Sequence, residues 1–468
     1  MIPIKDMKGK RVAVMGLGRS GLPTAQALLE AGAKVCAWDD GAASQAAAKA
    51  AGVPLVALAD DDWADIAVLV LSPGIPHTHP APHPVVSAAR ARGVNIIGDI
   101  ELLKRSVPEA RYVGITGTNG KSTTTALIGH IMTTAGGPVQ VGGNLGRPAL
   151  DLDPLERGGT YVLELSSFQL ELTKDGGFDV AVLLNITPDH LERHGGMAGY
   201  IAAKRLIFKN NSVAMIVGID DPECAAICAN LQRFYHETVI PISGTTPIAG
   251  GVYVKNGCLI NDIKGNREAV LSIADIATLP GDHNAQNAAA AFAAAWATGV
   301  SQNEIVAGLK SYPGLAHRQQ LVAHIDGVAY VNDSKATNPE ATSRALSCYD
   351  GIYWIAGGRA KEGSLDSLTP YLPRIRHAFL IGEAAEPFAA TLRETIDTRI
   401  SGTLDEATQN AHLLVQKETP DGAVVLLSPA CASYDQYPNF EERGHEFERC
   451  VRSLPGRIRQ FYELEDAV

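Results

Sequence analysis

The stretch VAVMGLGRSGLPTAQALLEAGAKVCAWDD, Val12 to Asp40, decides the fold of the N-terminal part of the chain. An apolar run leads into Gly16, Gly18 and Gly21, which have the G-x-G-x-x-G spacing, and a helical segment and a second apolar run follow. This order is typical of the first strand-helix-strand unit of a dinucleotide-binding domain, where the glycines let the backbone approach a pyrophosphate. The stretch therefore predicts a parallel sheet covered by helices, with a nucleotide site.

A second glycine-rich stretch, GITGTNGKSTTTALIGHIM (residues 114–132), predicts another phosphate-binding loop. Gly117 and Gly120 let backbone N–H groups approach phosphate oxygens, while Lys121 can reach a transferred phosphate and Ser122 can bind Mg²⁺. The loop departs from the strict G-x-x-x-x-G-K-[ST] pattern, because an isoleucine stands where the first glycine is expected. An ordinary glycine turn before a helix is the alternative, but the order of strand, loop, Lys-Ser and helix favours ATP as the ligand.

Length and composition exclude several classes of function. The 468 residues suggest about three domains at roughly 150 residues each. Acidic residues outnumber Lys plus Arg by 51 to 40, and the net charge of −11 argues against nucleic acid as a partner. The N-terminus lacks an apolar signal core, and the Ala-rich run AAAAFAAAWATG is too short to cross a membrane. We expect a cytoplasmic monomer that binds neither nucleic acid nor membranes.

The order of apolar runs predicts an α/β protein of three domains, because short β-branched runs alternate with Ala/Leu-rich helical segments. We expect an N-terminal Rossmann-like domain over 1–110 and a central P-loop ATPase-like domain with a parallel sheet over 111–314. A C-terminal Rossmann-like domain then covers 315–468. The break before 111 lies near RSVPEA, and the Pro/Gly-containing stretch LKSYPGLAHR supplies the second break.

Three further side chains are candidates for metal or phosphate chemistry. Glu164 ends the apolar run YVLE downstream of the second loop, where a carboxylate can hold the Mg²⁺ that bridges nucleotide phosphates; a hydrogen-bonded glutamate is the alternative. His190 and His194 have the i, i+4 spacing of a zinc-binding helix. However, HLERH is not the H-E-x-x-H order of a zinc protease, so we retain one of the two histidines only as a candidate ligand.

Six stretches together resemble the Mur ligases, which are ATP-dependent amide-forming enzymes of peptidoglycan precursor synthesis. They are GITGTNGKST, LELSSFQLE, NITPDHLERH, GDHNAQNAAAA, GLAHR and NDSKATN. The resemblance implies that the first domain binds the uridine diphosphate of a sugar and the second binds ATP with Mg²⁺. A C-terminal stretch, LLSPACASYDQYPNFEERG, is most similar to members that add D-glutamate to UDP-N-acetylmuramoyl-L-alanine through an acyl phosphate. The D-N-P-R motif of the diaminopimelate-adding members is absent.

The resemblance also implies the site residues, each from its place in a matching motif. For ATP they are Gly117, Thr118, Asn119, Gly120, Lys121, Ser122, Thr123, Asn284, Asn287, Arg318, Asp333 and Lys335. For the UDP-sugar they are Gly18, Arg19, Ser20, Asp39, Asp40, Gly74 and Asn144. For D-glutamate they are Thr337, Lys361, Ser433 and Phe440, the last through its backbone N–H. Ser122 and Glu164 would bind one Mg²⁺, His190 and Lys204 would support a second, and Lys121, His190 and Lys204 would be catalytic.

Lys204 illustrates how far the resemblance goes beyond composition. In YIAAKRLIF the residue alone indicates a lysine on a helix surface, with its stem on apolar neighbours. The resemblance instead implies a lysine carbamate, formed when the neutral amine captures CO₂. Such a group is an anion with two oxygens, and it suits Mg²⁺ far better than an ammonium does.

Three other functions stay open at the level of sequence. A related Mur or folylpolyglutamate-type ligase would take a different acceptor amino acid. An NAD-dependent oxidoreductase would use the first loop for a dinucleotide, with Asp39 or Asp40 on a ribose hydroxyl, although nothing downstream indicates hydride chemistry. A nucleotide-gated binding module would bind ATP without releasing phosphate.

Overall fold

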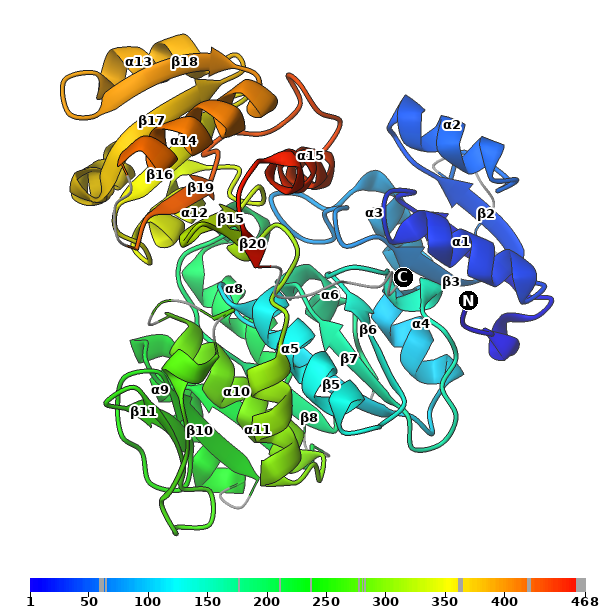
Figure 1. The fold of residues 1–468 in the computed structure, drawn as a ribbon. Helices are drawn as coiled ribbons and strands as arrows, with labels where there is room; N and C mark the ends of the chain where they lie inside the picture. Colours follow the sequence, from blue (N-terminus) through cyan, green and yellow to red (C-terminus); the bar gives the residue numbers. More distant parts are fainter. Residues whose placement is uncertain are drawn as a thin grey trace. The chain divides into compact units, whose positions relative to one another are not determined.

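The chain forms three sheets within two compact units. The computed structural model describes residues 1–459 except 59–62, 64, 176, 210–211, 236–237, 277, 280, 282, 361–364 and 419–421. Unit 1 comprises Met1–Ile276 with Asp282–Tyr312, and unit 2 comprises Ala277–Gly281 with Pro313–Val468. Unit 1 contains the N-terminal and central sheets and unit 2 contains the C-terminal sheet (Figure 1). This α/β architecture of three domains confirms the predicted fold class.

The N-terminal sheet is a small parallel sheet with the strand order β2-β1-β3-β4. Its elements are η1 (Lys5–Met7), β1 (Arg11–Met15), α1 (Gly21–Glu30), β2 (Lys34–Trp38), α2 (Ala42–Ala50), β3 (Ile66–Leu71), α3 (Pro84–Ala91), β4 (Asn95–Ile97) and α4 (Asp99–Ser106). The chain passes outward from β1 to β2 and then returns to β3 on the other side of β1. Ligands of such sheets bind beyond the carboxyl ends of the two strands that flank this switch point.

The central sheet has nine strands in the order β13-β12-β11-β10-β9-β8-β5-β7-β6. Its strands are β5 (Arg111–Thr116), β6 (Val139–Gly143), β7 (Thr160–Glu164), β8 (Val180–Leu183), β9 (Ala214–Gly218), β10 (Val239–Ser243), β11 (Val252–Lys255), β12 (Cys258–Asn261) and β13 (Glu268–Ser272). Strands β5 to β11 are parallel to their neighbours, whereas β12 and β13 add an antiparallel edge. Strand β5, which leads into the second glycine loop, lies between β7 and β8.

Helices cover both faces of this sheet. They are α5 (Lys121–Thr134), η2 (Ala149–Asp151), α6 (Ser167–Glu171), α7 (Leu191–His194), α8 (Met197–Arg205), α9 (Pro222–Tyr235), η3 (Ile273–Asp275), α10 (His283–Ala297) and α11 (Gln302–Ser311). Helices α5, α10 and α11 lie together over one face (Figure 1). Every residue from Ala288 to Ala295 in α10 is fully buried, since the small alanine side chains let this helix approach its neighbours closely.

The C-terminal sheet has the order β18-β17-β16-β19-β15-β14-β20, with β14 and β20 antiparallel to their neighbours. Its elements are β14 (Gln320–Ile325), β15 (Val328–Asn332), α12 (Pro339–Leu346), β16 (Ile352–Gly357), η4 (Leu365–Arg374), β17 (Ile375–Ile381), α13 (Ala385–Leu392), β18 (Asp397–Gly402), α14 (Leu404–Glu418), β19 (Val424–Leu427), α15 (Phe440–Ser453) and β20 (Ile458–Arg459). Strand β19 enters between β15 and β16, so the loops that follow these three strands meet at one edge of the sheet.

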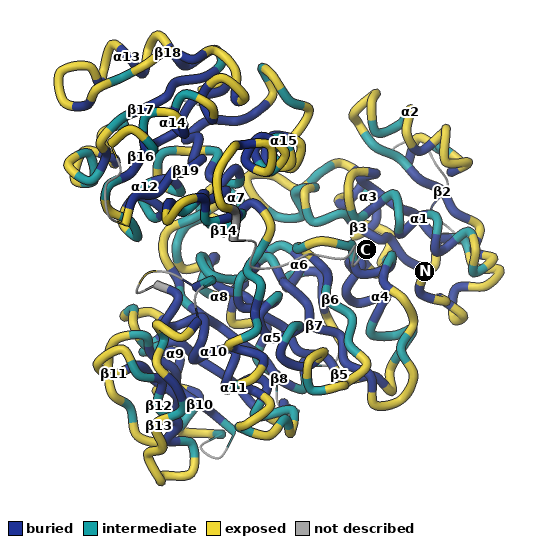
Figure 2. The backbone as a smooth tube through the Cα atoms, in the orientation of Figure 1, coloured by how far each residue is buried: buried dark blue, intermediate teal, exposed yellow. Residues whose placement is uncertain are grey.

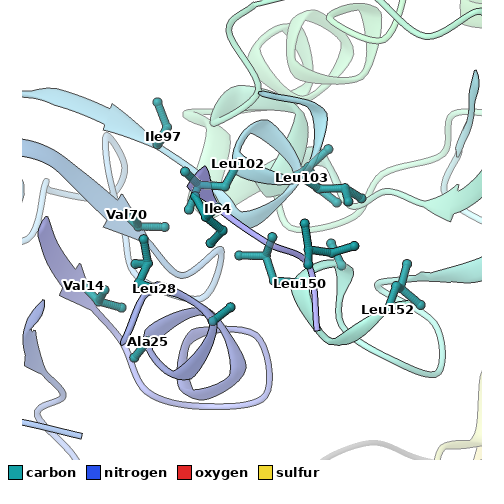
Figure 3. Close-up of a cluster of buried hydrophobic side chains, with 14 of the residues drawn as sticks. Ile4, Val14, Ala25, Leu28, Val70, Ile97, Leu102, Leu103, Leu150 and Leu152 are labelled. Carbon is teal, nitrogen blue, oxygen red and sulfur yellow. The ribbon is translucent and has the colours of Figure 1, made fainter. Parts of the chain in front are cut away.

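One hydrophobic cluster joins the first two sheets. It contains Val14, Leu28 and Val70 around the N-terminal sheet together with Leu150 and Leu152 at η2 (Figure 3). The inner strands of the three sheets are largely buried, whereas the edge strands β13 and β18 and the helix α2 are largely exposed (Figure 2). The predicted boundaries near 110 and 314 lie in the segments before β5 and β14; their exact positions stay a prediction.

Candidate active site

The second glycine loop connects β5 to α5 and has a shape that requires glycine. Gly117 and Gly120 have positive φ angles of 153° and 81°. A Cβ atom on Gly120 would also come within 2.2 Å of Asn287 Oδ1. The backbone N–H groups of Thr118 and Asn119 donate to the carbonyl and side-chain oxygens of Asn185. This fixes the loop at the amino end of α5, where the helix dipole favours an anion.

Two lysine side chains converge on this loop. Lys121 Nζ donates to the carbonyl oxygens of Gly117 and Thr118 at 3.0 and 2.8 Å, and Lys204 Nζ donates to Gly117 O at 2.8 Å. The composition-based interpretation of Lys204 as a surface residue is wrong, because only 2 % of the residue is exposed. Its burial, and next the charge of Lys121, lower the pKa of Lys204 to about 7. Two amines on one loop suit a polyphosphate ligand.

Glu164, at the carboxyl end of β7, meets the requirement for a metal ligand. Only 3 % of the residue is exposed, and Oε1 accepts a hydrogen bond of 2.7 Å from Asn144 Nδ2. The other carboxylate oxygen, Oε2, is buried and has no hydrogen-bond partner. A buried carboxylate oxygen without a partner costs free energy, and a divalent cation would offset that cost. Ser122, in the first turn of α5, is also buried.

The predicted second metal set pairs His190 with Lys204. Within the described part of the chain, no group of three or more His, Cys, Asp or Glu side chains gathers as a metal site. His190 has a left-handed backbone with φ of 50°, and its Nε2 lies 3.6 Å from Asp189 Oδ2. The role of His190 and Lys204 toward a second Mg²⁺ therefore stays a prediction.

His194 is a buried histidine that contacts α6 and, through Tyr200, α8. Its Nε2 lies 2.9 Å from Ser167 Oγ, and its Nδ1 lies 3.4 Å from Glu171 Oε1. Burial, and next the charge of Lys204, lower the pKa of His194 to about 4, while burial raises the pKa of Glu171 to about 7. His194 is therefore neutral near pH 7.

A chain of amides links α10 to the second glycine loop. Thr124 Oγ1 donates to Asn287 Oδ1 at 3.2 Å, and Asn287 Nδ2 donates to Asn284 Oδ1 at 2.9 Å. Both asparagines are buried. The position of Asn287 against Gly120 shows how α10 limits the space beside the loop; that the two asparagines lie near an adenine stays a prediction.

The first glycine loop, between β1 and α1, is closed by carboxylate and hydroxyl groups. Leu17 N donates to Asp39 Oδ2 at 2.6 Å, and Gly41 N donates to Asp39 Oδ1 at 2.7 Å. A Cβ atom on Gly21 would lie 1.7 Å from Gly16 O, whereas one on Gly18 would meet open space. Gly21 thus serves close packing, and Gly18 leaves room at the loop for a ligand.

The other residues predicted for the UDP-sugar lie around this loop. Ser20 Oγ is 3.3 Å from Ser72 Oγ, and Asp40 Oδ2 is 2.9 Å from His83 Nε2. Arg19 donates to the carbonyl oxygen of Asn144 at 3.4 Å and to that of Gly146. Arg19 therefore reaches from the N-terminal domain to the segment that follows β6.

Gly74 is held by a residue that the sequence analysis did not single out. Arg193 Nη1 donates to Gly74 O at 3.0 Å and Nη2 donates to Pro73 O at 3.4 Å. The guanidinium also lies 4.5 Å from the centre of the Phe168 ring. Arg193 lies within the quoted stretch NITPDHLERH, but only the tertiary structure identifies its partners.

In unit 2, Asp333 lies directly after β15 and is buried. Its Oδ2 accepts a bond of 2.8 Å from Ser428 Oγ, and its Oδ1 accepts one of 3.2 Å from Gln319 N. Burial raises the pKa of Asp333 to about 7. Two residues further on, Lys335 Nζ lies 3.8 Å from the centre of the Phe440 ring. The loop after β15 and the start of α15 therefore lie together.

The remaining predicted residues of unit 2 are distributed around the same edge. Thr337 follows Lys335 in the loop after β15, Ser433 is a buried residue of the loop after β19, and Arg318 is exposed. Lys361 lies outside the described residues.

Three family models match successive parts of the chain. The Mur ligase MurD-like N-terminal domain matches residues 10–98, the Mur ligase middle domain matches 115–295, and the glutamate ligase domain of Mur ligases matches 317–431. The chain belongs to the Mur ligase family. The three matches follow the three sheets in order, so the sequence relationship and the observed architecture agree.

Two relatives that match nearly the whole length of this Mur ligase bear the name UDP-N-acetylmuramoylalanine--D-glutamate ligase. The protein from Paramagnetospirillum magneticum is 52% identical over 458 residues, covering 97% of this chain and 99% of the relative. The protein from Rhodospirillum rubrum is 52% identical over 462 residues, covering 97% of each chain.

Solved structures of other Mur ligases share the fold. A UDP-N-acetylmuramoyl-L-alanyl-D-glutamate--2,6-diaminopimelate ligase superposes with a TM-score of 0.57 at 18% identity, over 97% of this chain and 95% of the other. The UDP-N-acetylmuramate-alanine ligase MurC from Thermotoga maritima gives 0.56 at 16% identity, over 95% and 99%. In the described residues of this Mur ligase, no helix is long and apolar enough to cross a membrane.

Proposed function

We propose that this Mur ligase joins D-glutamate to UDP-N-acetylmuramoyl-L-alanine at the expense of ATP. The observation that carries the choice of acceptor is the similarity of 97% of the chain, at 52% identity, to ligases of that name. The first glycine loop supports the use of a nucleotide sugar as substrate. Asp39 and Ser72 form hydrogen bonds with the backbone of this loop, and a Cβ atom on Gly18 would meet open space. We place the reaction in the cytoplasm, where ATP is available.

The reaction forms an amide in two steps. The L-alanine carboxylate of the UDP-sugar attacks the γ-phosphorus of ATP, which gives an acyl phosphate and ADP. The amine of D-glutamate then attacks the acyl carbon, and the tetrahedral intermediate expels phosphate and leaves the amide. A carboxylate needs this activation because oxide is too poor a leaving group at neutral pH. Most of the rate acceleration comes from positioning and charge neutralisation, as in other phosphoryl transfers.

The second glycine loop supplies the positive charge for the first step. Lys121 and Lys204 now donate to loop carbonyls, which are neutral acceptors. With ATP on the loop, Lys121 exchanges these bonds for charge-assisted bonds to the transferred phosphate. Ser122 and Glu164 would hold Mg²⁺, which neutralises phosphate charge when bound.

Unit 2 carries the residues that this proposal assigns to the amino acid and three of those that it assigns to the nucleotide. Arg318, Asp333 and Lys335 serve the nucleotide, while Thr337, Lys361, Ser433 and Phe440 serve D-glutamate. The proximity of Lys335 to the Phe440 ring supports this grouping, because it brings a nucleotide residue and an amino-acid residue to one edge of the sheet.

Mass analysis of the product tests the proposal. The protein is incubated with UDP-N-acetylmuramoyl-L-alanine, ATP, Mg²⁺ and, in separate reactions, D-glutamate, L-glutamate, L-alanine or diaminopimelate. We expect a glutamyl adduct and phosphate release with D-glutamate alone. An adduct with another amino acid would establish a related Mur or folylpolyglutamate-type ligase, and ATP binding without phosphate release in every mixture would reject an enzyme.

A further inference from the structure

Arg443 is a buried cation on α15, one helical turn after Phe440. Only 1 % of the residue is exposed. Its Nε donates to Ser334 Oγ at 3.0 Å, and its Nη2 donates to the carbonyl oxygens of Ser334 and Cys431 at 2.9 and 3.0 Å. Ser334 Oγ in turn donates to Phe440 O at 2.8 Å. The guanidinium therefore ties the loop after β15, the loop after β19 and the start of α15 together.

A fourth segment closes on the same group. The chain after β16 passes so near that a Cβ atom on Gly358 would lie 3.1 Å from Arg443 Nη1 and 2.3 Å from Ala432 O. The φ of Gly358 is 125°, which other residues rarely adopt. Arg443 thus lies where the loops after β15, β16 and β19 meet the amino end of α15.

The positive charge of Arg443 is not neutralised by a contacting carboxylate. Across the described residues, no Asp or Glu forms an ion pair with it, although the carboxylate of Asp435 acts on it as a nearby charge. Its Nη1 is buried with no hydrogen-bond partner. Burial lowers the pKa of Arg443 to about 10, so the group is charged at neutral pH. The neighbouring Cys431 thiol does not neutralise this charge. Burial raises the pKa of the thiol to about 12, so it is protonated and neutral at pH 7.

A purely structural role does not explain this arrangement. A buried charge whose hydrogen-bond partners are all neutral costs several kcal/mol, and apolar side chains of similar volume commonly stabilise such a site as well or better. The cost is offset when an anion is bound nearby. The segments that Arg443 ties together carry three residues proposed for D-glutamate, namely Thr337, Ser433 and Phe440.

We propose that Arg443 is a positioning residue of the amino-acid site: it holds these three segments in register, and its charge favours an acceptor amino acid with an acidic side chain over a neutral one. The inference rests on the proposed function and deepens it, because it assigns part of the acceptor specificity to a residue of the stretch LLSPACASYDQYPNFEERG for which the resemblance implied no role. Arg443 acts through Ser334, Cys431 and the start of α15.

Four variants test this role. Arg443→Met removes both the charge and the hydrogen bonds at similar volume, and Arg443→Lys keeps the charge but loses the planar donor arrangement. Ser334→Ala removes only the hydroxyl between Arg443 and Phe440 O. Phe447→Leu is the matched control, because Phe447 is a fully buried residue of the same helix that belongs to the hydrophobic core. For each, the melting temperature and the KM for D-glutamate, ATP and the UDP-sugar are measured.

We expect Arg443→Met to raise the KM for D-glutamate on the order of 100-fold and Arg443→Lys about 10-fold, as for loss of buried charged hydrogen-bonding groups. The KM values for ATP and the UDP-sugar should change less than about threefold. Ser334→Ala should raise the KM for D-glutamate severalfold. This increase should not be additive with that of Arg443→Lys, because both substitutions break the same hydrogen-bond network. Phe447→Leu should lower the melting temperature and leave the KM for D-glutamate unchanged.

Discrimination between D-glutamate and D-glutamine separates the charge from the packing. The preference for D-glutamate, as a ratio of kcat/KM values, should fall about tenfold in Arg443→Met and persist in Arg443→Lys. An unchanged ratio in Arg443→Met, or an unchanged KM for D-glutamate in Arg443→Lys and Ser334→Ala, would overturn the inference. If Arg443→Met does not fold, the latter two variants decide. A wild-type protein that does not use D-glutamate rejects the proposed function instead.

Discussion

The two glycine loops of unit 1 share a strand-loop-helix geometry and differ in the charges placed around them. At the first loop, the carboxylate of Asp39 accepts two backbone N–H groups, and the nearby Arg19 reaches away to the segment after β6. At the second loop, the amines of Lys121 and Lys204 lie on the loop carbonyls, and the buried Glu164 has an unpartnered oxygen. The first arrangement suits holding a nucleotide, and the second suits moving a phosphoryl group.

This difference shows why a glycine pattern alone does not define chemistry. In both loops the glycines allow the backbone to approach a ligand or a neighbouring strand. Phosphoryl transfer additionally needs cations that neutralise developing charge, and these must be excluded from water to act strongly. Changes at each loop should therefore affect different measurements.

The largest effect should come from Lys121→Ala. We expect turnover to fall on the order of 1000-fold or more, because a cation at the transferred phosphate is lost. The dissociation constant of the UDP-sugar, measured by calorimetry, should change less than about twofold. Lys49→Ala, which removes an exposed lysine from α2, is the control and should alter neither quantity. Loss of UDP-sugar binding in Lys121→Ala would contradict separate tasks for the two loops.

Lys204→Ala should reduce turnover on the order of 100-fold, in line with loss of one preorganised electrostatic group. If the residue works as a carbamate, acetate or formate should restore part of the activity, because a small carboxylate supplies the missing anionic oxygens. The same acids should not restore Lys121→Ala, which makes that variant the matched control. A well-resolved crystal structure of active, Mg²⁺-loaded protein with no density beyond Lys204 Nζ would exclude the carbamate.

Gly21→Ala and Gly18→Ala separate packing from ligand space at the first loop. A methyl group at Gly21 would overlap Gly16 O, so we expect a loss of about 2–3 kcal/mol in the free energy of unfolding. Gly18→Ala should change that energy by less than about 0.5 kcal/mol and weaken UDP-sugar binding instead. Denaturant unfolding and calorimetry measure the two effects; equal stability of the two variants would show that Gly21 is not a packing residue.

Asp39→Asn should weaken UDP-sugar binding about tenfold, since the amide replaces one acceptor by a donor facing a backbone N–H. The KM for ATP should stay constant, because the second loop has no contact with Asp39 among the described residues. A similar rise in the dissociation constant of the UDP-sugar and in the KM for ATP would instead indicate that the substitution disturbs unit 1 as a whole.

The smallest effect concerns the pH dependence of stability that arises from the neighbouring side chains of His194 and Glu171. His194 has a native pKa of about 4, below the ordinary histidine value of 6.5, so the unfolded chain takes up its proton first as pH falls. Its contribution to stability is complete above pH 6.5 and is lost between 6.5 and 4. Glu171, whose native pKa is about 7, acts in the opposite direction as pH falls from 7 toward 4.5.

His194→Gln therefore tests the sign of this contribution. Between pH 6.5 and 5, the free energy of unfolding should fall by about 1 kcal/mol less in the variant than in the wild type. The reason is that only the wild type has a histidine at position 194 that takes up a proton when the chain unfolds. Denaturant unfolding at the two pH values gives the comparison. An identical pH dependence of both proteins would show that His194 is not buried in its neutral form.

Much of the fold could be predicted because it depends on residues that are close together in the sequence. The apolar runs and the glycines after β1 and β5 are contiguous, so the parallel sheets and both loops follow from short stretches. The antiparallel edge of the central sheet was missed although a local signal exists. Asn256 and Gly257, between β11 and β12, both have positive φ, and Asn-Gly is the dipeptide typical of such hairpin turns.

What the sequence by itself determined is the order of elements, the two loops and the family, because these depend on neighbouring residues. Only the tertiary structure decided which charges are buried and what they contact. Lys204 is 87 residues away from Gly117 in the chain, and Arg443 contacts Ser334 across 109 residues. The pKa of a lysine and the role of an arginine depend on solvent exclusion and on partners from distant segments, and no local pattern records either.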